Sequence, residues 1–427
     1  MDINQLLLGV DCACGAHHTC DIEAVYVEEG AIARLSALCT PYAHVLIVAD
    51  ENTYAAAGEK TEAALAEKIA ARVIFGKEIL IPNEEAAARV QEKLGGISLI
   101  VGIGSGVIQD LCKYVSKLSS IPYMVVATAP SMDGYASTGA AMILGGMKET
   151  VSAGLPRAIV ADVDVLKNAP MPMLAAGFGD IIGKYSALCD WRLSVAVNGE
   201  KFCPYIYGIT YDMIEQVKSM ANGILARDAE SVKALFEALV VVGIMISFAG
   251  SSRPASGSEH HLSHFFEISG IVQNKPYLTH GIDVAYSTVV TANLREKLCA
   301  APFRANRFRE DERQTLAKLT KAYNASVAEG CMALQKKVSA YERDLTPIYK
   351  EKEDEIKAIL KECPSAEEIE KILALVKLDM KEFTAFYGDA RIEEAVRYAK
   401  DLKDRYTVLW LYYDLFGEEE ISYGMEI

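Results

Sequence analysis

The chain has 427 residues, 51% of them hydrophobic, which is enough for two or three domains with cores of their own. Its net charge of -15 and the lack of a block of Lys and Arg argue against nucleic acid as the main partner, because phosphate binding needs clustered cations. The first residues lack a basic stretch followed by an apolar core, so we expect no secretory signal. The longest apolar run, residues 235–249, is too short to span a bilayer and is expected to be a buried helix.

Ten cysteines are spread over this long chain, a pattern typical of reduced thiols, and we expect a cytoplasmic protein. A dense set of soft ligands nevertheless lies near the N-terminus, with Cys12, Cys14, His17, His18 and Cys20. Structural zinc commonly uses two ligand pairs separated by a longer loop, and the second pair is missing here. A plain turn with packed thiols is therefore the favoured interpretation, and a metal site is the alternative.

From residue 43 onward, short β-rich runs alternate with amphipathic stretches. We expect strands at 44–50, 72–75, 98–102, 122–127 and 156–162, and helices at 61–71, 83–94 (with Asn83 as its cap) and 107–118. Strands and helices in alternation indicate a parallel sheet covered on both faces. The predicted fold class is therefore α/β, with a Rossmann-like parallel sheet in an N-terminal domain of residues 1–165.

Beyond about residue 165 the strand signals nearly vanish, and stretches rich in Ala, Leu, Glu and Lys take over. The long ones cover residues 228–249, 310–340, 365–381 and 391–415. Residues 166–427 are therefore expected to form an all-helical domain. Charged stretches such as 350–361 are expected to be solvated helix faces. The boundary between two such domains is a common place for a ligand.

The third predicted strand leads into Gly102-Ile-Gly104-Ser-Gly106 at the start of the next helix. Glycines let the backbone approach a phosphate closely, and a helix N-terminus offers N–H groups and partial positive charge. A tight strand-to-helix turn is the alternative, since the spacing differs from that of a Rossmann loop. Asp50 ends an earlier strand and is expected to accept hydrogen bonds from an adenosine ribose, while residues 128–137 add hydroxyls and a carboxylate at the same sheet edge.

Three of the seven histidines fall within five residues, at His260, His261 and His264. If this segment is helical, His260 and His264 share one face and His261 points elsewhere. His280 follows them, and Asp180 lies upstream, just past two glycines. One carboxylate with two imidazoles suits zinc, nickel or ferrous iron, with positions left open for a substrate oxygen.

Five segments of this chain together resemble the iron-containing alcohol dehydrogenase superfamily, and within it most closely the bacterial glycerol-1-phosphate dehydrogenase family. They run in family order and cover roughly residues 40–290. The segments are Gly102-Ile-Gly-Ser-Gly-Val-Ile-Gln-Asp110, Thr128-Ala-Pro-Ser-Met-Asp-Gly-Tyr-Ala-Ser137, Gly177-Phe-Gly-Asp-Ile-Ile-Gly-Lys184, Arg253-Pro-Ala-Ser-Gly-Ser-Glu-His-His-Leu-Ser-His264 and His280-Gly281.

The resemblance implies NAD(H), with NADP(H) as the alternative, and one divalent metal ion held by Asp180, His260 and His280. It implies substrate contact by Asp133, Asp180 and His264. About four extra residues within 268–276 depart from the family pattern, which bears on His280. The residues expected to contact the cofactor, with Asp50 and Gly104 added from the loop argument above, are Asp50, Gly104, Gly106, Val107, Ile108, Gln109, Asp110, Thr128, Ala129, Pro130, Ser131 and Ser137.

The activity implied by this resemblance is the reversible reduction of dihydroxyacetone phosphate to sn-glycerol 1-phosphate. The cofactor would supply the hydride, and the metal ion, with zinc or nickel ahead of iron, would stabilise charge on the substrate oxygen. We expect Asp180 and His264 to be catalytic. Contact with the substrate is the role we expect first for His264, and proton donation ranks second. An unperturbed imidazole pKa near ~6.5 suits proton transfer at neutral pH.

A phosphorylated substrate needs local cations in a chain that is acidic overall. Lys184 and Arg253 are expected to bind the phosphate, with ordinary salt bridges as the alternative. An acid at the ribose, such as Asp50, would favour NAD over NADP. Two other functions stay open: a related polyol dehydrogenase such as glycerol dehydrogenase, and a catalytically silent binding protein on the same scaffold. A homo-oligomer is compatible with the sequence, which does not determine the oligomeric state.

Overall fold

The computed structural model describes residues 2–78, 80–145, 147–303 and 311–417. The chain forms two compact units. Unit 1 comprises Met1–Ile181 and Glu215–Ser252, and unit 2 comprises Ile182–Ile214 and Arg253–Ile427. The chain passes between the units three times: inside helix α7 (Met171–Asn198), inside helix α8 (Pro204–Ser219) and between Ser252 and Arg253. The boundaries of these units differ from the domain boundary expected at residue 165. That domain boundary stays a prediction.

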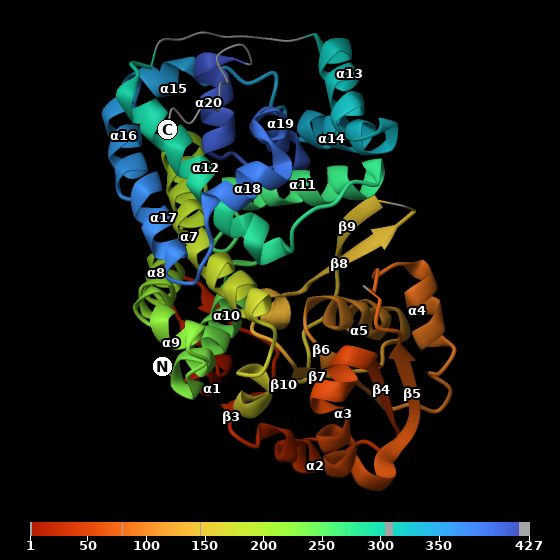
Figure 1. The fold of residues 1–427 in the computed structure, drawn as a ribbon. Coiled ribbons are helices and arrows are strands. Elements are labelled where there is room, and N and C mark those ends of the chain that lie inside the picture. The colour runs from red at the N-terminus through yellow and green to blue at the C-terminus, as the bar shows by residue number, and fades with distance from the viewer. Residues whose placement is uncertain (1, 79, 146, 304–310, 418–427) are drawn as a thin grey trace. The chain divides into compact units, whose positions relative to one another are not determined.

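Unit 1 is built on a six-stranded parallel sheet with the strand order β3-β10-β7-β6-β4-β5 (Figure 1). Its inner strands are buried along almost their whole length, because they are nearly continuous runs of Val, Ile, Leu and Ala. The predicted α/β fold class is confirmed. The strands are β3 (Ala24–Glu28), β4 (Val45–Asp50), β5 (Ile69–Phe75), β6 (Leu99–Gly104), β7 (Tyr123–Ala127) and β10 (Ala158–Asp162).

Three of the helices that follow strands of this sheet were expected from the sequence, and two of them agree with that prediction. Helix α4 (Glu84–Gln91) is capped by Asn83, whose side chain accepts the Ala86 N–H at 2.9 Å, and α5 (Gly106–Ser119) follows β6 directly. The expected helix at 61–71 was misplaced. Helix α3 (Glu51–Leu65) begins ten residues earlier, because Asp50 and Thr53 form a capping box at the end of β4.

The sequence reading missed β3 and two hairpins. One hairpin joins β1 (Val10–Asp11) to β2 (His17–His18), and the other joins β8 (Gly139–Leu144) to β9 (Met147–Ser152). Each is a separate antiparallel pair outside the main sheet. The short helical elements of unit 1 are α1 (Ile3–Leu7), η1 (Ala31–Arg34), α2 (Leu35–Leu38), η2 (Ala66–Lys68), η3 (Gly134–Ala136), α6 (Val163–Leu166) and α9 (Ala221–Leu225).

Helix α10 (Ala229–Ala249) contains the longest apolar run of the chain. Among the described residues, it is the one helix whose length and composition would allow it to cross a membrane. However, 72% of its most apolar window is buried inside the protein. The prediction of a buried helix is therefore confirmed, and α10 belongs to the core of unit 1.

Unit 2 is helical, as predicted, and its described part contains no strand. Each of the stretches 310–340, 365–381 and 391–415, expected to be helical, is divided into shorter helices in the structure. Glu310 lies outside the described residues. Asn324 and Asp379, for example, each accept a backbone N–H as an N-cap inside those ranges. The helices are α11 (Ser258–Gln273), α12 (His280–Ala300), α13 (Glu312–Ala322), α14 (Ala325–Lys337), α15 (Thr346–Glu351), α16 (Glu353–Lys361), α17 (Ala366–Ala374), α18 (Met380–Tyr387), α19 (Asp389–Tyr398), η4 (Ala399–Leu402) and α20 (Val408–Phe416).

Candidate active site

The sheet of unit 1 has a topological switch point beside β4. Strand β4 lies between β5 and β6, so the chain first moves to one edge of the sheet and then returns to the other side of β4. In open α/β sheets, ligands bind at the carboxyl ends of the strands at such a point. Asp50 ends β4 and Gly104 ends β6, so both lie at this edge.

Two of the three glycines in the loop are explained by packing, and the third is not. A Cβ on Gly102 would lie 2.8 Å from the Cys112 Sγ, and one on Gly104 would lie 2.6 Å from the Ile108 Cβ. These two glycines are therefore needed for α5 to pack closely on β6, which supports the alternative of a tight strand-to-helix turn. A Cβ on Gly106 would make only an ordinary contact, so that glycine, the first residue of α5, is not explained by packing.

Several residues expected to contact the cofactor are occupied by structural contacts. Ile108 and Gln109 are buried, and the Gln109 Nε2 donates to the backbone oxygens of Gly134 (3.0 Å) and Tyr135 (2.9 Å). Gln109 thus holds the loop after β7 in place. The Ser137 hydroxyl also donates to the Gly134 oxygen, at 3.2 Å. Direct cofactor contact by these side chains stays a prediction.

Asp50 has a structural function that the sequence reading missed. Its Oδ1 accepts the backbone N–H groups of Asn52 at 2.8 Å and Thr53 at 2.9 Å, which caps α3. Both bonds use the same oxygen atom. Its contact with a ribose stays a prediction.

Asp133 and Asp180, both expected at the substrate, lie together in unit 1. The Asp133 N–H donates to the Asp180 Oδ2 at 2.9 Å, which orients that carboxylate. Asp180 is carried by α7, one turn after Gly177. A Cβ on Gly177 would lie 1.9 Å from the Pro130 oxygen, so only glycine lets α7 approach this loop so closely.

Three histidines of unit 2 form a cluster. The ring centroids of His260 and His280 are 5.1 Å apart, those of His264 and His280 are 5.6 Å apart, and those of His260 and His264 are 6.2 Å apart. The segment is helical, and His260 and His264 share a face of α11, as predicted. His261 is fully buried on another side of α11, where the charges of Lys403 and Arg405 reach it.

Two of these imidazoles are held by neighbours on α11 that the sequence reading missed. The His260 Nδ1 lies 2.6 Å from the Glu259 Oε1, and the His280 Nδ1 lies 3.3 Å from the Ser263 Oγ. A partner on Nδ1 leaves Nε2 as the ligand atom, and such partners commonly orient histidines that bind metals. His260 and His280 present nitrogen atoms within 4.8 Å of each other.

The electrostatics of Glu259 and His260 favour a neutral imidazole. Burial, followed by the charge of Lys184, lowers the pKa of His260 well below its usual range. Burial, followed by the charge of Asp190, raises the pKa of Glu259 to about 8. A neutral imidazole is the form that coordinates a metal ion, so His260 is prepared to act as a ligand.

A second group in unit 2 shares His280. His264, Glu267 and His280 offer ligand atoms within 4.8 Å of one another, and the His264 Nδ1 lies 3.9 Å from the Glu267 Oε2. Glu267 was also missed, although its position three residues after His264 places it on the same helix face. An ion near His280 therefore has carboxylate and imidazole groups available from α11.

Arg253 was expected to bind the substrate phosphate, with an ordinary salt bridge as the alternative, and its contacts favour the alternative. Its side chain is 5% exposed and forms a two-pronged ion pair with Glu200, with distances of 2.8 Å and 2.6 Å. It also donates to the Tyr406 oxygen at 2.9 Å and the Ser194 hydroxyl at 3.2 Å. Because all three guanidinium nitrogens are engaged, Arg253 anchors unit 2 internally. Lys184 is fully buried, and its charge acts on His260, so it stays a candidate.

Comparison with known proteins agrees with these observations. The family model of the iron-containing alcohol dehydrogenases matches residues 26–170. A glycerol-1-phosphate dehydrogenase [NAD(P)+] of Geobacillus thermodenitrificans is 33% identical, covering 67% of this chain and 73% of the relative. One from Halalkalibacterium halodurans is 29% identical, covering 94% of each chain.

Solved structures show the same fold. A probable glycerol dehydrogenase from Sinorhizobium meliloti 1021 has a TM-score of 0.60 at 17% identity, covering 93% of this chain and 96% of that one. An alcohol dehydrogenase from Oenococcus oeni has a TM-score of 0.59 at 14% identity, covering 92% and 98%. These two likenesses concern the fold alone. The sequence relatives show that the chain belongs to the glycerol-1-phosphate dehydrogenase family of the iron-containing alcohol dehydrogenase superfamily.

Proposed function

We propose that this protein is a metal-dependent glycerol-1-phosphate dehydrogenase that uses NAD(H) or NADP(H) to interconvert dihydroxyacetone phosphate and sn-glycerol 1-phosphate. The family relatives at 33% identity support this activity over that of a glycerol dehydrogenase. The observation that carries the proposal is the histidine cluster, in which His260 and His280 lie together and each contacts a neighbour through Nδ1, as metal-binding histidines commonly do. A silent scaffold has no need for such costly buried polar groups.

In this proposal Asp180 joins His260 and His280 as the third ligand of the metal ion. Helix α7 supports this, because it continues unbroken from Asp180 in unit 1 into unit 2. In unit 2 a Cβ on Gly183 would lie 2.5 Å from the Val284 Cγ1, so glycine is needed where α7 packs on α12. Two imidazoles and a carboxylate fit a borderline divalent ion, and we propose zinc or nickel, with iron as the alternative. When bound, the ion would act as a Lewis acid on the substrate carbonyl.

The cofactor would bind at the switch point of the sheet, with its phosphates at the start of α5 and its ribose near Asp50. The backbone N–H groups that begin at Gly106 favour an anion there, because they have no partners within the helix. The nicotinamide supplies the hydride in the reduction. The role of the protein is to hold the loop of residues 128–137, which Gln109 anchors, against this cofactor.

The substrate is proposed to lie against Asp133, His264 and Lys184. Lys184 would balance the charge of the substrate phosphate, since a buried ammonium group is stabilised by an anion. Reduction leaves negative charge on the former carbonyl oxygen, and His264 would donate the proton that this oxygen takes up. The carboxylate of Glu267, 3.9 Å from the His264 Nδ1, would stabilise the positive charge of a protonated imidazole.

The decisive experiment measures NADH oxidation by the purified protein with dihydroxyacetone phosphate and with unphosphorylated dihydroxyacetone. We expect strong preference for the phosphorylated ketone, loss of activity after chelation, and recovery with zinc or nickel. The variant His260→Ala should lose both the activity and one equivalent of metal, whereas His44→Ala, which changes an exposed histidine of unit 1, should lose neither.

Other outcomes point to the other candidate functions. Equal or better turnover of dihydroxyacetone would identify a polyol dehydrogenase. Binding of NADH without turnover of either ketone, in protein that retains its metal, would identify a silent scaffold. Activity that survives complete removal of the metal would refute the proposed metal site.

A further inference from the structure

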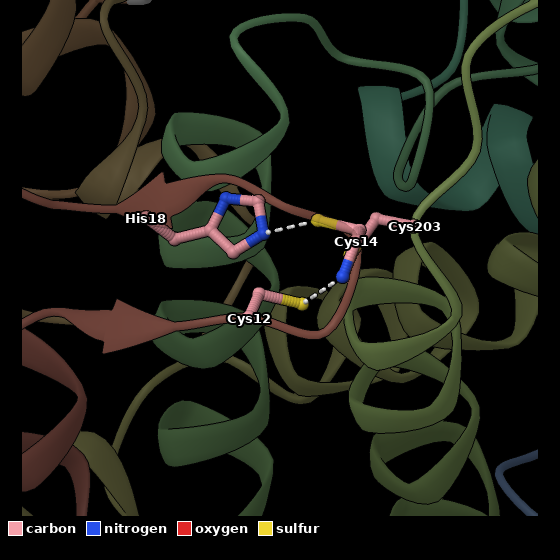
Figure 2. A group of neighbouring side chains, drawn as sticks. All are labelled: Cys12, Cys14, His18 and Cys203. Carbon is pink, nitrogen blue, oxygen red and sulfur yellow. Dashed lines mark hydrogen bonds between the residues drawn. The ribbon is translucent and has the colours of Figure 1, made fainter.

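The N-terminal hairpin of unit 1 brings three metal-ligating side chains together. Strands β1 and β2 pair antiparallel, with Val10 opposite His18, and the turn between them contains Cys12 and Cys14. The Cys12 and Cys14 sulfur atoms and an imidazole nitrogen of His18 all lie within 4.8 Å of one another. Figure 2 shows these side chains converging, and also draws Cys203 of unit 2.

The turn places the two sulfur atoms by backbone geometry. The Gly15 N–H donates to the Cys12 oxygen at 2.9 Å, and the Cys12 N–H donates to the Ala16 oxygen at 3.0 Å. Gly15 has a φ of 86°, a conformation that favours glycine. The Cys14 N–H then points at the Cys12 Sγ at 3.5 Å (Figure 2). A backbone donor directed at sulfur stabilises the thiolate, which is the form that binds a metal ion.

His18 is fixed as a ligand by contacts within unit 1. Its Nδ1 lies 3.0 Å from the Phe248 oxygen, and its ring stacks on the Phe248 ring with centroids 5.3 Å apart. A carbonyl can only accept, so Nδ1 carries the proton, and in a neutral ring Nε2 then presents a lone pair. That Nε2 faces the Cys14 Sγ at 3.4 Å (Figure 2).

This spacing agrees with a shared tetrahedral ion. Bonds of about 2.3 Å to sulfur and about 2.05 Å to nitrogen, at the tetrahedral angle, place the two ligand atoms about 3.5 Å apart. The distance between the Cys14 Sγ and the His18 Nε2 is 3.4 Å. The carbonyl on the far side of the imidazole is also the kind of partner that metal-binding histidines use.

We propose that Cys12, Cys14 and His18 bind a structural zinc ion, separate from the proposed catalytic metal. Two thiolates and one imidazole are ligands that zinc prefers in structural sites. A fourth ligand has to come from outside this hairpin or from water. The ion would hold β1 and β2, which are only two residues each, against α10, the helix that contains Phe248.

His17 offers a matched control, because it is adjacent to a proposed ligand but faces away from it. Successive side chains of a strand point to opposite sides, and His17 is exposed while His18 is buried. The His17 Nδ1 pairs with the Asp11 Oδ1 at 2.7 Å. Replacing His17 therefore removes a histidine from the same strand without touching the proposed site.

The test loads the full-length protein with cobalt(II) in place of zinc and records its absorption spectrum. Cobalt bound to thiolates gives charge-transfer bands in the near ultraviolet, and the proposed catalytic ligands Asp180, His260 and His280 contain no sulfur. We expect these bands in the wild-type protein and in His17→Ala. The double variant of Cys12→Ser and Cys14→Ser should lose them and bind one zinc ion fewer per chain by elemental analysis.

A second measurement does not need the cysteine variants to fold. Cys14 is exposed, so iodoacetamide should modify it at least tenfold more slowly in the zinc-loaded wild type than after chelation, as followed by peptide mass spectrometry. The proposal would be overturned by a cobalt spectrum without thiolate bands in the wild type. It would equally be overturned by alkylation of Cys14 at the same rate with and without zinc, or by a Cys12–Cys14 disulfide in protein purified under reducing conditions.

Discussion

Glu259 and His260 are adjacent in the chain and also contact each other, with the Glu259 Oε1 only 2.6 Å from the His260 Nδ1. Neighbours in a helix ordinarily point in different directions. Glu259 reaches its neighbour because it lies in the first turn of α11, where its Oε1 also accepts the Gly257 N–H at 3.0 Å. One carboxylate therefore both caps the helix start and orients an imidazole.

The first prediction concerns this carboxylate. Glu259→Gln keeps the shape of the side chain but replaces the carboxyl group at the His260 Nδ1 with an amide, whose oxygen is a weaker acceptor, so the His260 imidazole becomes a weaker ligand. We expect the metal affinity to fall about 10- to 100-fold, with activity restored at high metal concentration. The measurement is activity against free zinc or nickel in a metal buffer. Glu230→Gln, on the exposed first turn of α10, is the control and should leave the curve unchanged.

The second prediction separates the substrate phosphate from the rest of the substrate. Lys184→Met removes the buried charge while keeping an unbranched side chain. A charged hydrogen bond is worth about 1.5–3 kcal/mol, so KM for dihydroxyacetone phosphate should rise about 10- to 150-fold. KM for NADH should change little. If KM for the two ligands rises equally, Lys184 supports the fold of the site and does not bind phosphate.

The third prediction concerns Arg253, for which the structure indicates a different outcome. Arg253→Ala should lower the free energy of unfolding by about 2–4 kcal/mol, because Glu200 and Ser194 lose a buried partner. Adding Glu200→Gln should recover part of this loss, since Glu200 then carries no unmatched charge. The measurement is thermal unfolding of both variants. In the folded fraction of Arg253→Ala, KM for dihydroxyacetone phosphate should match that of the wild type. A large rise in this KM would show that Arg253 binds the substrate.

The fourth prediction uses two helical glycines. Gly177→Ala places a methyl group 1.9 Å from the Pro130 oxygen, so α7 or the loop has to move. We expect a lower melting temperature together with weaker metal binding, because Asp180 is one turn away on α7. Gly208→Ala in α8 meets no atom within 4 Å and should be neutral or stabilising by up to about 1 kcal/mol. Similar melting temperatures for both variants would contradict the close packing at Gly177.

The fifth prediction is a dependence of stability on pH. Burial raises the pKa of Asp414, whose carboxylate accepts the Tyr349 hydroxyl at 2.5 Å, to about 6. The folded pKa exceeds the unfolded value of about 4, so the folded state binds the proton more tightly and this contribution to stability is lost as pH rises from about 4 through 6. Asp414→Asn should not show this loss. Relative to the wild type, it should gain up to about 3 kcal/mol between pH 4 and pH 7 in unfolding experiments, and a constant difference would refute the shifted pKa.

The sequence predicted the sheet core well because a strand buried on both faces has a pattern of its own. The runs at 45–49, 99–103 and 123–127 are almost uninterrupted apolar residues, and all became inner strands. The capping box at Asp50 was overlooked because α3 begins directly at the end of β4, without a loop to signal a new element. The β8–β9 hairpin was overlooked because β8 begins with Gly139, Ala140 and Ala141 and lacks the run of β-branched residues that is typical of a strand.

The site was predicted in part, and its gaps have a physical cause. His260, His264 and His280 were recognised from their chemistry and spacing, and they lie together. The orienting groups Glu259 and Ser263 are common residue types whose function depends on the partner they reach. The partner of Arg253 is likewise 53 residues away in the chain, so its ion pair is visible only in three dimensions.

The passage of the chain between units inside α7 and α8 limits how this protein can be divided. Unit 1 includes residues 215–252, and unit 2 includes residues 182–214, so neither is one continuous segment. A gene truncated near residue 165 would encode a sheet without α10, and hence a fragment with its apolar surface uncovered. Fragments split at this position should therefore aggregate when expressed singly, and a cofactor-binding half should not be obtainable as an independent recombinant product.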